Sequence, residues 1–170
     1  MPPVVRPDPG SQAWLDGLTA VSRTLGSAEF ERELVALLNL VVPVDHCVVF
    51  TYAPAAGAGH LFTHGKMSPA QAQSLADDYV GRYHARDPHF ARLAAAVGPD
   101  ETDRFVPLPL PAPYDPAYRN HFFDRNHLVD KAATIGRVEH GAVYCNFYRM
   151  GSSGPYSERD RALLERILPL

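Results

Sequence analysis

The chain has 170 residues, 46% of them hydrophobic and 21% charged, which is typical of a single globular domain with its own core. Its formal net charge is -3 and its Lys and Arg residues form no cluster, so direct binding to a nucleic-acid backbone is not expected. No apolar run is long enough to cross a bilayer, and residues 1–10 lack the basic and apolar regions of a signal peptide. We therefore expect a cytoplasmic protein without membrane contact, with residues 1–10 as a disordered lead.

Two amphipathic helices are predicted first. The first has an N-cap at Ser11 and ends at Gly26, and the second has an N-cap at Ser27 and ends before Pro43. Residues at helical spacing form their apolar sides: Trp14, Leu15, Leu18, Val21 and Leu25 in the first, and Phe30, Leu34, Leu37, Leu38 and Val41 in the second.

A hairpin and further helices follow. Residues 44–52 are β-branched and aromatic, and a Pro/Ala/Gly loop at 54–59 leads to a second strand at 60–64. Ser68 and Pro69 predict the start of a helix that runs to Tyr83 with an aromatic face. A shorter helical segment with Phe90, Leu93 and Ala94 is expected after Pro88, and the proline-rich residues 106–113 predict an extended surface loop.

The last part of the sequence predicts a helix, a second hairpin and a final helix. Asp115 and Pro116 begin the first helix, residues 130–141 and 141–150 form two strands that meet near His140, and Ser157 caps the last helix. Because strands of a hairpin are sequence neighbours and the middle helices connect the hairpins, the sheet should be mostly antiparallel with helices packed on it. The predicted fold class is α+β, an α/β/α sandwich of the GAF and PAS kind.

One strand of this sheet carries candidate ligand-contacting residues. In the strand that includes Val143, the side chains of Tyr144, Asn146 and Tyr148 point to one face and those of Cys145 and its alternate neighbours to the other. Aromatic surface mixed with hydrogen-bonding groups suits a small-molecule cavity. The alternative is a half-exposed sheet face whose tyrosine hydroxyls contact water.

A second group of candidates lies at the end of the third predicted helix. Tyr79, Tyr83 and Asp87 follow one another at spacings of four, so two phenols and a carboxylate could orient a polar head group at the mouth of a pocket. The structural alternative is that Asp87 merely caps the helix that begins at Pro88, which is a common arrangement.

No metal, cofactor or catalytic motif is recognised. The histidines near Asp87 and Asp124 lack the spacing of a zinc site, and the sequence has no nucleophile elbow, Cys-x-x-Cys pair or phosphate-binding glycine loop. We expect no cofactor, no metal and no enzymatic activity. Cys47 and Cys145 lie in apolar strands and are expected to be buried free thiols.

The second half of the sequence resembles the N-terminal GAF-like sensor region of LuxR-type transcriptional regulators. The resemblance rests on DDYVGRYHARDPHF, on YRNHFF followed by a strand, on the strand end NFYR and on SERDRALLERILPL. It implies that residues 11–170 are one sensor domain whose last helix links to a helix-turn-helix domain, a signature that this chain does not contain. DNA would then be bound only through that separate domain.

The resemblance also implies a ligand pocket. In the branch of the family that binds acyl-homoserine lactones, one helix carries Trp and Tyr. An Asp-Pro pair comes after a longer spacer, and a further Trp follows it. Here the order Tyr79, Tyr83, Asp87 is similar, but the spacer is short and the one Trp is Trp14, which favours a different small molecule. The candidate ligand-binding residues are Tyr52, Phe62, Tyr79, Tyr83, Asp87, Tyr118, Phe122, Tyr144 and Asn146.

Three functions remain open at this stage. The first is a ligand-sensing regulatory domain that binds a small, partly apolar molecule and signals through its terminal helix. The second is a ligand-free dimerisation module, in which an exposed stripe on that helix pairs with a second copy; its residues are Leu163, Leu164, Ile167 and Leu168. The third is a small GAF-fold enzyme that uses reactive cysteines.

Overall fold

The computed structural model describes residues 6–53, 55–89, 105–107 and 114–168. Its α-helices are α1 (Gln12–Arg23), α2 (Phe30–Val41), α3 (Pro69–Asp78), α5 (Pro116–Phe122) and α6 (Glu158–Ile167). Its strands are β1 (His46–Ala53), β2 (Gly57–Gly65), β3 (Phe105–Pro107), β4 (Leu128–Val138) and β5 (Gly141–Met150). A π-helix, η1 (Tyr79–Tyr83), and short 3-10 segments η2 (His84–Arg86), η3 (Asp124–Asn126) and η4 (Gly151–Ser153) complete the order. No helix among these residues is both long and apolar enough to span a membrane.

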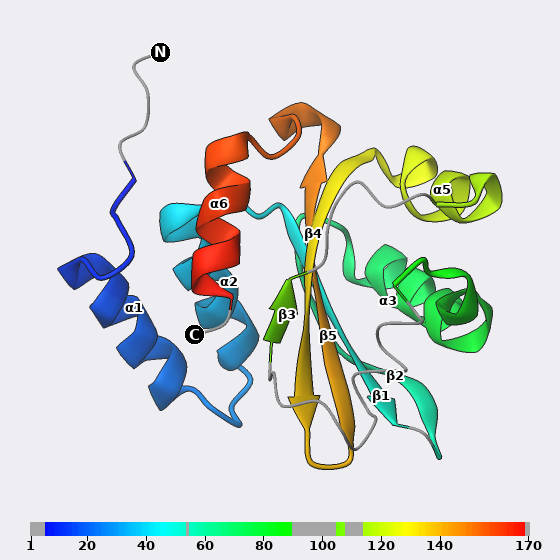
Figure 1. Cartoon of the computed structure of the whole chain (residues 1–170), viewed down its shortest axis with the longest axis horizontal. Helices are drawn as coiled ribbons and strands as arrows, with labels where there is room; N and C mark the ends of the chain where they lie inside the picture. Colours follow the sequence, from blue (N-terminus) through cyan, green and yellow to red (C-terminus); the bar gives the residue numbers. More distant parts are fainter. Residues whose placement is uncertain (1–5, 54, 90–104, 108–113, 169–170) are drawn as a thin grey trace.

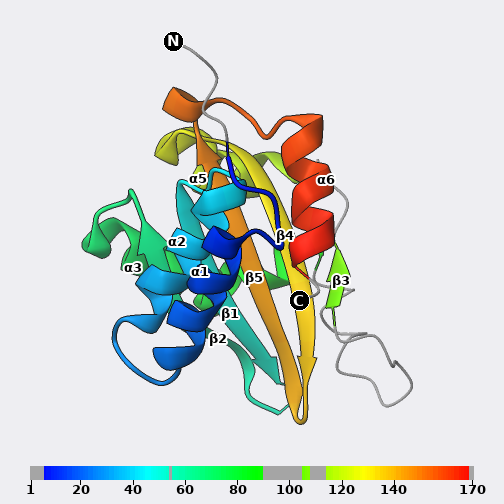
Figure 2. The same ribbon diagram turned by 90° about the vertical axis from the view of Figure 1, so that its left-hand side faces the viewer.

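The strands form one antiparallel sheet in the order β2-β1-β5-β4-β3. Two sequence-local hairpins, β1–β2 and β4–β5, meet through the long-range pairing of β1 with β5. Helices α1, α2 and α6 cover one face and α3 and α5 the other (Figure 1). This arrangement confirms the predicted α+β sandwich, and the short strand β3 lies at the edge beside β4 (Figure 2).

Each face of the sheet has its own core. The odd-numbered residues Cys145 and Phe147 of β5 pack toward α2 and α6, together with Trp14 of α1. The even-numbered residues Tyr144 and Tyr148 pack toward α3 and α5. This alternation follows from the period of two along a strand, so one strand contributes both to a plain apolar core and to a polar, aromatic layer.

The helix starts were predicted well and some details were not. Ser11, Ser68, Asp115 and Ser157 are N-caps as expected, and Ser157 forms a capping box with Asp160. Three features of the structure differ from the prediction. The N-cap of α2 is Glu29 instead of Ser27, Leu25 is 68% exposed because α1 ends before it, and β2 begins at Gly57 inside the expected loop. The predicted helical segment around Phe90 and most of the proline-rich loop lie outside the described residues.

The terminal helix α6 packs onto its own domain. Leu164 and Ile167 are buried in the core shared with α2, and Leu163 and Leu168 are partly buried against it. The stripe that was predicted to be exposed is therefore largely buried, because α6 packs on the face of the sheet that α2 also covers instead of extending away from it. In this conformation Leu164 and Ile167 do not present a surface to a second copy.

The β4–β5 turn gives a testable steric prediction. Gly141 is the first residue of β5, beside Tyr52 of the neighbouring strand β1, and a Cβ at this position would overlap the backbone carbonyl oxygen of Tyr52. Because backbone cannot move aside cheaply, Gly141→Ala should lower the free energy of unfolding by about 1–3 kcal/mol. Gly151→Ala is the matched control, since its Cβ would meet only ordinary van der Waals neighbours. Urea denaturation of both variants checks this, and equal midpoints would contradict it.

Candidate functional site

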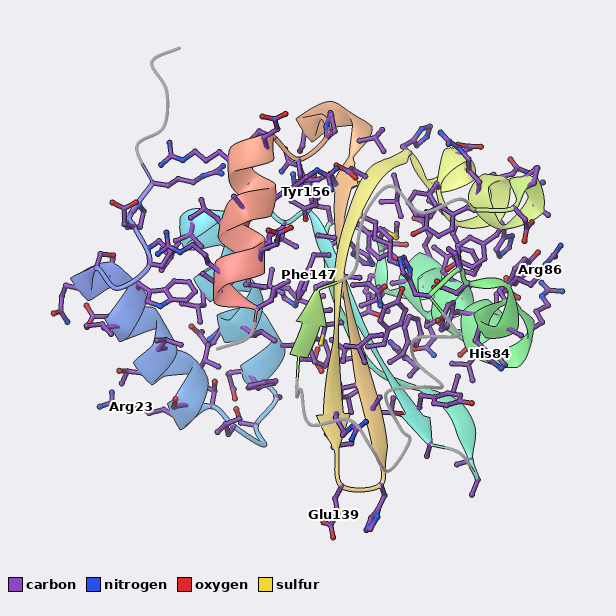
Figure 3. The ribbon with its side chains drawn as sticks, in the orientation of Figure 1. Arg23, His84, Arg86, Glu139, Phe147 and Tyr156 are labelled. Atoms are coloured by element: carbon purple, nitrogen blue, oxygen red, sulfur yellow. The ribbon has the colours of Figure 1, made fainter. Side chains whose placement is uncertain are left out.

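The polar site lies between the sheet and the layer formed by α3 and α5. Helix α3 continues into the π-helix η1 at Tyr79 and into η2, whose C-cap is Asp87. A π-helix is rare and often marks a functional site; here its first residue, Tyr79, stacks on Phe50 of β1, and Asp87 after η2 bonds Tyr144 of β5. Figure 3 shows side chains filling the space between the sheet and these helices, with His84 and Arg86 at the outer end of the layer.

Asp87 is the centre of a buried hydrogen-bond cluster. It is 3% exposed, and three tyrosine hydroxyls lie within bonding distance of its Oδ2. These come from Tyr79 at 3.3 Å, Tyr118 at 3.0 Å and Tyr144 at 3.2 Å. Its Oδ1 accepts the backbone N–H of His89 at 2.9 Å and lies 3.1 Å from the Nδ1 of that imidazole. Four segments of chain therefore converge on one carboxylate.

Lys131 supplies the positive charge of this cluster. It projects from β4, is 1% exposed, and its Nζ lies 2.7 Å from the hydroxyl of Tyr144 and 3.5 Å from Oδ2 of Asp87. Its ammonium also lies over the rings of Tyr114, Tyr144 and Tyr148, at 4.9 to 5.8 Å from their centroids. Because one carboxylate faces one ammonium, the Asp87–Lys131 pair is electrically neutral.

The protonation of the site follows from burial and from this pair. Burial alone would raise the pKa of Asp87, but Lys131 and the hydrogen bonds from His89 hold that pKa well below its usual value. Burial lowers the pKa of Lys131, and Asp87 offsets part of that effect. Burial and the charge of Asp87 raise the pKa of Tyr144 and Tyr118, so their hydroxyls remain protonated donors at neutral pH.

An aromatic shell surrounds the polar cluster. Tyr114 stacks on Tyr118 with centroids 5.1 Å apart, and Tyr79 stacks on Phe50 of β1 at 4.1 Å. The hydroxyl of Tyr114 is buried and has no hydrogen-bond partner among the described residues. Leaving a buried hydroxyl without a partner is costly, so Tyr114 is a polar group of the site that its described neighbours do not satisfy.

A small apolar cavity adjoins the cluster. It has a volume of about 30 Å³, and two of its lining residues also contact the cluster: Tyr79 bonds Asp87, and the ring of Tyr148 lies under Lys131. Its other lining residues include His46, Val48, Phe50, Ala72, Ala76 and Phe122. Sites for small molecules typically measure about 300–1,000 Å³, whereas this cavity has room for roughly one or two water molecules. A larger ligand therefore requires the α3–η1 layer to move away from the sheet.

Several residues predicted from the sequence come together here. Tyr79, Asp87, Tyr118 and Tyr144 form the cluster, and Phe122 lines the cavity. Asn146 lies on the same face of the sheet, fully buried, with its amide donating to carbonyl oxygens of β1 and β5 and its Oδ1 without a partner among the described residues. The carboxylate of Asp87 also accepts the backbone N–H of His89, two residues on, while most of the helix expected to begin at Pro88 lies outside the described residues.

Three predicted residues lie elsewhere. Tyr83 stacks on His121 at 4.7 Å and packs against Phe122, because the wider π-helical turn rotates it away from Asp87. Phe62 packs against Phe30 of α2 on the opposite face of the sheet. Tyr52 is half-buried near the far end of β1 and is not among the residues that line the cavity.

Four residues of this site were not predicted from the sequence: Lys131, His89, Tyr114 and His46. Lys131 stands among small and apolar residues in DKAATIG, at a position whose alternate neighbours Ala133 and Ile135 are core residues. A lysine in phase with the buried face of a strand is a detectable signal, because a buried ammonium requires an anionic partner. Its partner, Asp87, is distant in sequence and could not be identified from spacing.

His46 gives a pH prediction. Its pKa is lowered to about 4, first by burial and then by nearby His64, from an ordinary 6.5. The unfolded chain therefore binds one more proton than the folded chain between pH 6.5 and 4, so stability falls as pH drops through this window, by up to about 3 kcal/mol. The lowered pKa values of Asp45 and Asp87 act below pH 4.

Thermal unfolding at a series of pH values checks this prediction. The variant His46→Phe should have a flatter stability profile between pH 6.5 and 4 than the natural chain. His140→Gln is the control, since His140 is 88% exposed and its removal should leave the profile unchanged. Parallel profiles for the natural chain and His46→Phe would show that another group titrates.

The two thiols are poorly suited to chemistry. Cys47 is fully buried and Cys145 half-buried, and both are free. Burial raises the pKa of Cys145 to about 12 and that of Cys47 well above its usual value. Because the thiolate is the reactive form, the third function considered above receives no support from this geometry.

Two solved structures share this fold. The chain is similar to the LBD domain of VqsR from Pseudomonas aeruginosa, with a TM-score of 0.62 and 16% identity over 94% of this chain and 92% of that one. It is also similar to the N-acylhomoserine lactone dependent LuxR family transcription factor CepR2 from Burkholderia cenocepacia, with a TM-score of 0.60 and 15% identity over 90% and 85% of the two chains. No protein-family profile and no curated protein matches the sequence. The chain has the fold of LuxR-type ligand-binding domains.

Proposed function

We propose that this chain is the ligand-sensing domain of a LuxR-type transcriptional regulator and binds a small, uncharged, largely apolar molecule between the sheet and the α3–α5 layer. The observation that carries the proposal is a buried polar cluster next to an apolar cavity, in a fold shared with regulator ligand-binding domains. Polar groups of this kind fix the orientation of a ligand whose apolar part supplies most of the buried area.

The charge balance of the cluster restricts the ligand. Asp87 and Lys131 already neutralise each other in a buried setting. A charged head group would enter without a counter-ion, and burying an unpaired charge is far more costly than burying a hydrogen-bonded neutral group. The ligand is therefore neutral where it meets the cluster.

A short path connects this site with α6. On β4, Lys131 points into the cluster while its neighbour Asp130 contacts the other side of the domain. Oδ2 of Asp130 accepts the guanidinium of Arg161 on α6 at 2.6 Å and the backbone N–H of Tyr156 at 2.9 Å. A register irregularity interrupts the β4–β5 pairing directly before Asp130. Movement of Lys131 on ligand binding would be transmitted through one peptide unit to the terminal helix.

This path is the proposed output of the sensor. A ligand changes the position of α6 only if it binds two arrangements of the domain with different affinity. Expansion of the small cavity supplies such a difference, because the ligand fits only the arrangement in which the α3–η1 layer has moved. A DNA-binding module or a second copy that contacts α6 would then respond to the ligand.

A matched pair of probes tests the binding proposal. Methyl octanoate is neutral and octanoate is charged at the same end of the same chain. We expect the ester to raise the melting temperature of the domain and the carboxylate to leave it unchanged. Stabilisation by octanoate alone, or by neither probe, would contradict a neutral, apolar ligand of this kind.

Two variants on one helix locate the binding. Ala72→Leu adds bulk to a side chain that lines the cavity, whereas Ala70→Leu adds the same bulk on the exposed side of α3. The first should abolish the stabilisation by methyl octanoate and the second should keep it. Native mass spectrometry of the freshly purified chain would also detect a co-purifying molecule as an added mass that is lost on denaturation.

A further inference from the structure

We propose that Lys131 forms a reversible imine with an apolar aldehyde or ketone that enters the cavity, so that the site recognises a carbonyl group by its chemistry as well as by its shape. This inference rests on the proposed ligand-sensing function and names the class of ligand. It is carried by a fully buried primary amine that is hydrogen-bonded to a proton relay and lies over the ring of Tyr148, a residue that also lines the apolar cavity.

The amine is isolated from water and from other amines. The sequence has two lysines, Lys66 and Lys131. The Lys66 side chain is 57% exposed and paired with Asp45, whereas the Lys131 side chain is 1% exposed. An imine survives in such a site because the water that hydrolyses it is excluded, and an amine becomes nucleophilic when desolvation favours its neutral form.

A chain of hydrogen bonds can take the proton from Lys131. Nζ donates to the hydroxyl of Tyr144 at 2.7 Å, and that hydroxyl donates to Oδ2 of Asp87 at 3.2 Å. One proton can therefore pass from Nζ to the tyrosine oxygen while the tyrosine proton passes to Oδ2 of Asp87. The backbone N–H of His89 remains bonded to Oδ1 of Asp87 at 2.9 Å.

This transfer keeps the cluster neutral. Lys131 loses its positive charge as Asp87 loses its negative charge, so no unpaired charge is left in the buried site. Burial lowers the pKa of Lys131, which reduces the cost of releasing the proton. Among the described residues, the other titratable groups that face Nζ are the phenols of Tyr114 and Tyr148, and burial raises the pKa of both, so neither adds a charge.

The reaction balances without an oxidant or reductant. The lone pair of neutral Nζ attacks the carbonyl carbon, a C–N bond forms, and the carbonyl π pair moves to oxygen, which takes the proton held by Asp87. One proton then leaves the nitrogen through Tyr144 to Asp87, and Asp87 passes it to the hydroxyl group. That group departs as water, and the nitrogen lone pair completes the C=N bond. Aldehyde and amine are consumed, and imine and one water are formed.

The cavity selects the rest of the molecule. Tyr79 and Tyr148 line the cavity and also contact the cluster, so a carbonyl group at Lys131 places its substituent among apolar side chains. The residues that line it include no Asp, Glu, Lys or Arg, so they offer no ion pair to a keto acid and few hydrogen bonds to a sugar. The structure thus fits an alkyl or aryl carbonyl compound.

Reductive trapping tests the proposal on the natural chain. Octanal and cyanoborohydride are added at neutral pH, and the modified lysines are identified by peptide mapping. We expect an adduct at Lys131 that saturates with octanal concentration, with labelling of Lys66 that rises in proportion to octanal. Burial lowers the pKa of Lys131, and each unit of that lowering increases its neutral fraction about tenfold. Labelling confined to Lys66 and the N-terminal amine would overturn the proposal.

Variants and a control probe separate the imine from simple binding. Lys131→Arg keeps the positive charge and cannot form an imine, whereas Lys66→Arg should leave the Lys131 adduct unchanged. Tyr144→Phe breaks the relay and should slow trapping at Lys131 by roughly 100-fold. If Lys131→Arg does not fold, peptide mapping of the natural chain still shows whether the adduct forms at Lys131.

1-Octanol has the same chain without a carbonyl group and completes the test. If octanal and 1-octanol both raise the melting temperature but no adduct forms at Lys131, the ligand-sensing function stands and the imine is refuted. If neither compound stabilises the domain and no adduct forms, both proposals fail for molecules of this class. Stabilisation by both compounds, with 1-octanol suppressing the Lys131 adduct, supports both.

Discussion

Replacing Lys131 by methionine is expected to lower the free energy of unfolding by about 3–5 kcal/mol. The side chain is buried, and its ammonium is the described cation nearest to the Asp87 carboxylate. Without it, Asp87 stays buried as an anion with only hydrogen bonds around it, or it takes up a proton at a cost that depends on pH. Asp87→Asn should be destabilising for the reciprocal reason, since it leaves a buried ammonium without a counter-ion.

The double variant gives the sharper result. Because Asp87→Asn with Lys131→Met removes both charges, it should be more stable than either single variant, with a coupling of several kcal/mol in a double-mutant cycle. Arg82→Met is the control, because Arg82 and Asp78 form an exposed pair that should contribute less than about 1 kcal/mol. Additive effects of the two buried substitutions, measured by urea denaturation, would mean that the pair is not energetically coupled.

Asp130→Asn is expected to release α6 from the sheet. The substitution preserves shape but can turn one acceptor oxygen into an NH₂ group that faces two donors, the backbone N–H of Tyr156 and the guanidinium of Arg161. Asp130 is 8% exposed, so water replaces these bonds poorly. We expect a loss of about 2–3 kcal/mol in the local stability of α6.

Hydrogen exchange measures this loss directly. Protection of the amides of α6 should fall by roughly 30- to 100-fold, while that of β1 and β5 changes less. Asp124→Asn is the control, since Asp124 is 55% exposed in a long ion pair with Arg119. Uniform loss of protection across the whole domain would show that Asp130 supports global folding instead of the docking of one helix.

The elements that the sequence predicted well are those with local causes. Caps such as Ser68 with Pro69 and Ser157 with Asp160 act within four residues, so they identify helix starts without knowledge of the fold. Alternation along β5 likewise placed Tyr144 and Phe147 on opposite faces. Two hairpins and the connecting helices then determined the sandwich.

The parts of the site that were missed depend on contacts distant in sequence. Asp87 and Tyr144 are 57 residues apart and Asp87 and Tyr118 are 31 apart, so no spacing rule connects them. The π-helical turn at Tyr83 also changes the expected period, which is why one of the predicted tyrosines faces His121 instead of Asp87. Phe62, also proposed as a ligand contact, lies opposite Val49 and packs with it in the other core, because cross-strand partners share a face of the sheet.

The pairing of β1 with β5 also has a consequence for how the protein becomes functional. Val48 and Asn146, which it brings together, are 98 residues apart, whereas each hairpin forms from adjacent segments. Closing so long a loop is slow, and rates of folding fall as such non-local contacts increase. The whole cluster around Asp87 lies on this pairing or within the loop it closes. During synthesis, the site can therefore capture its ligand only after β5 has emerged and docked, so the ligand cannot assist the earlier steps of folding.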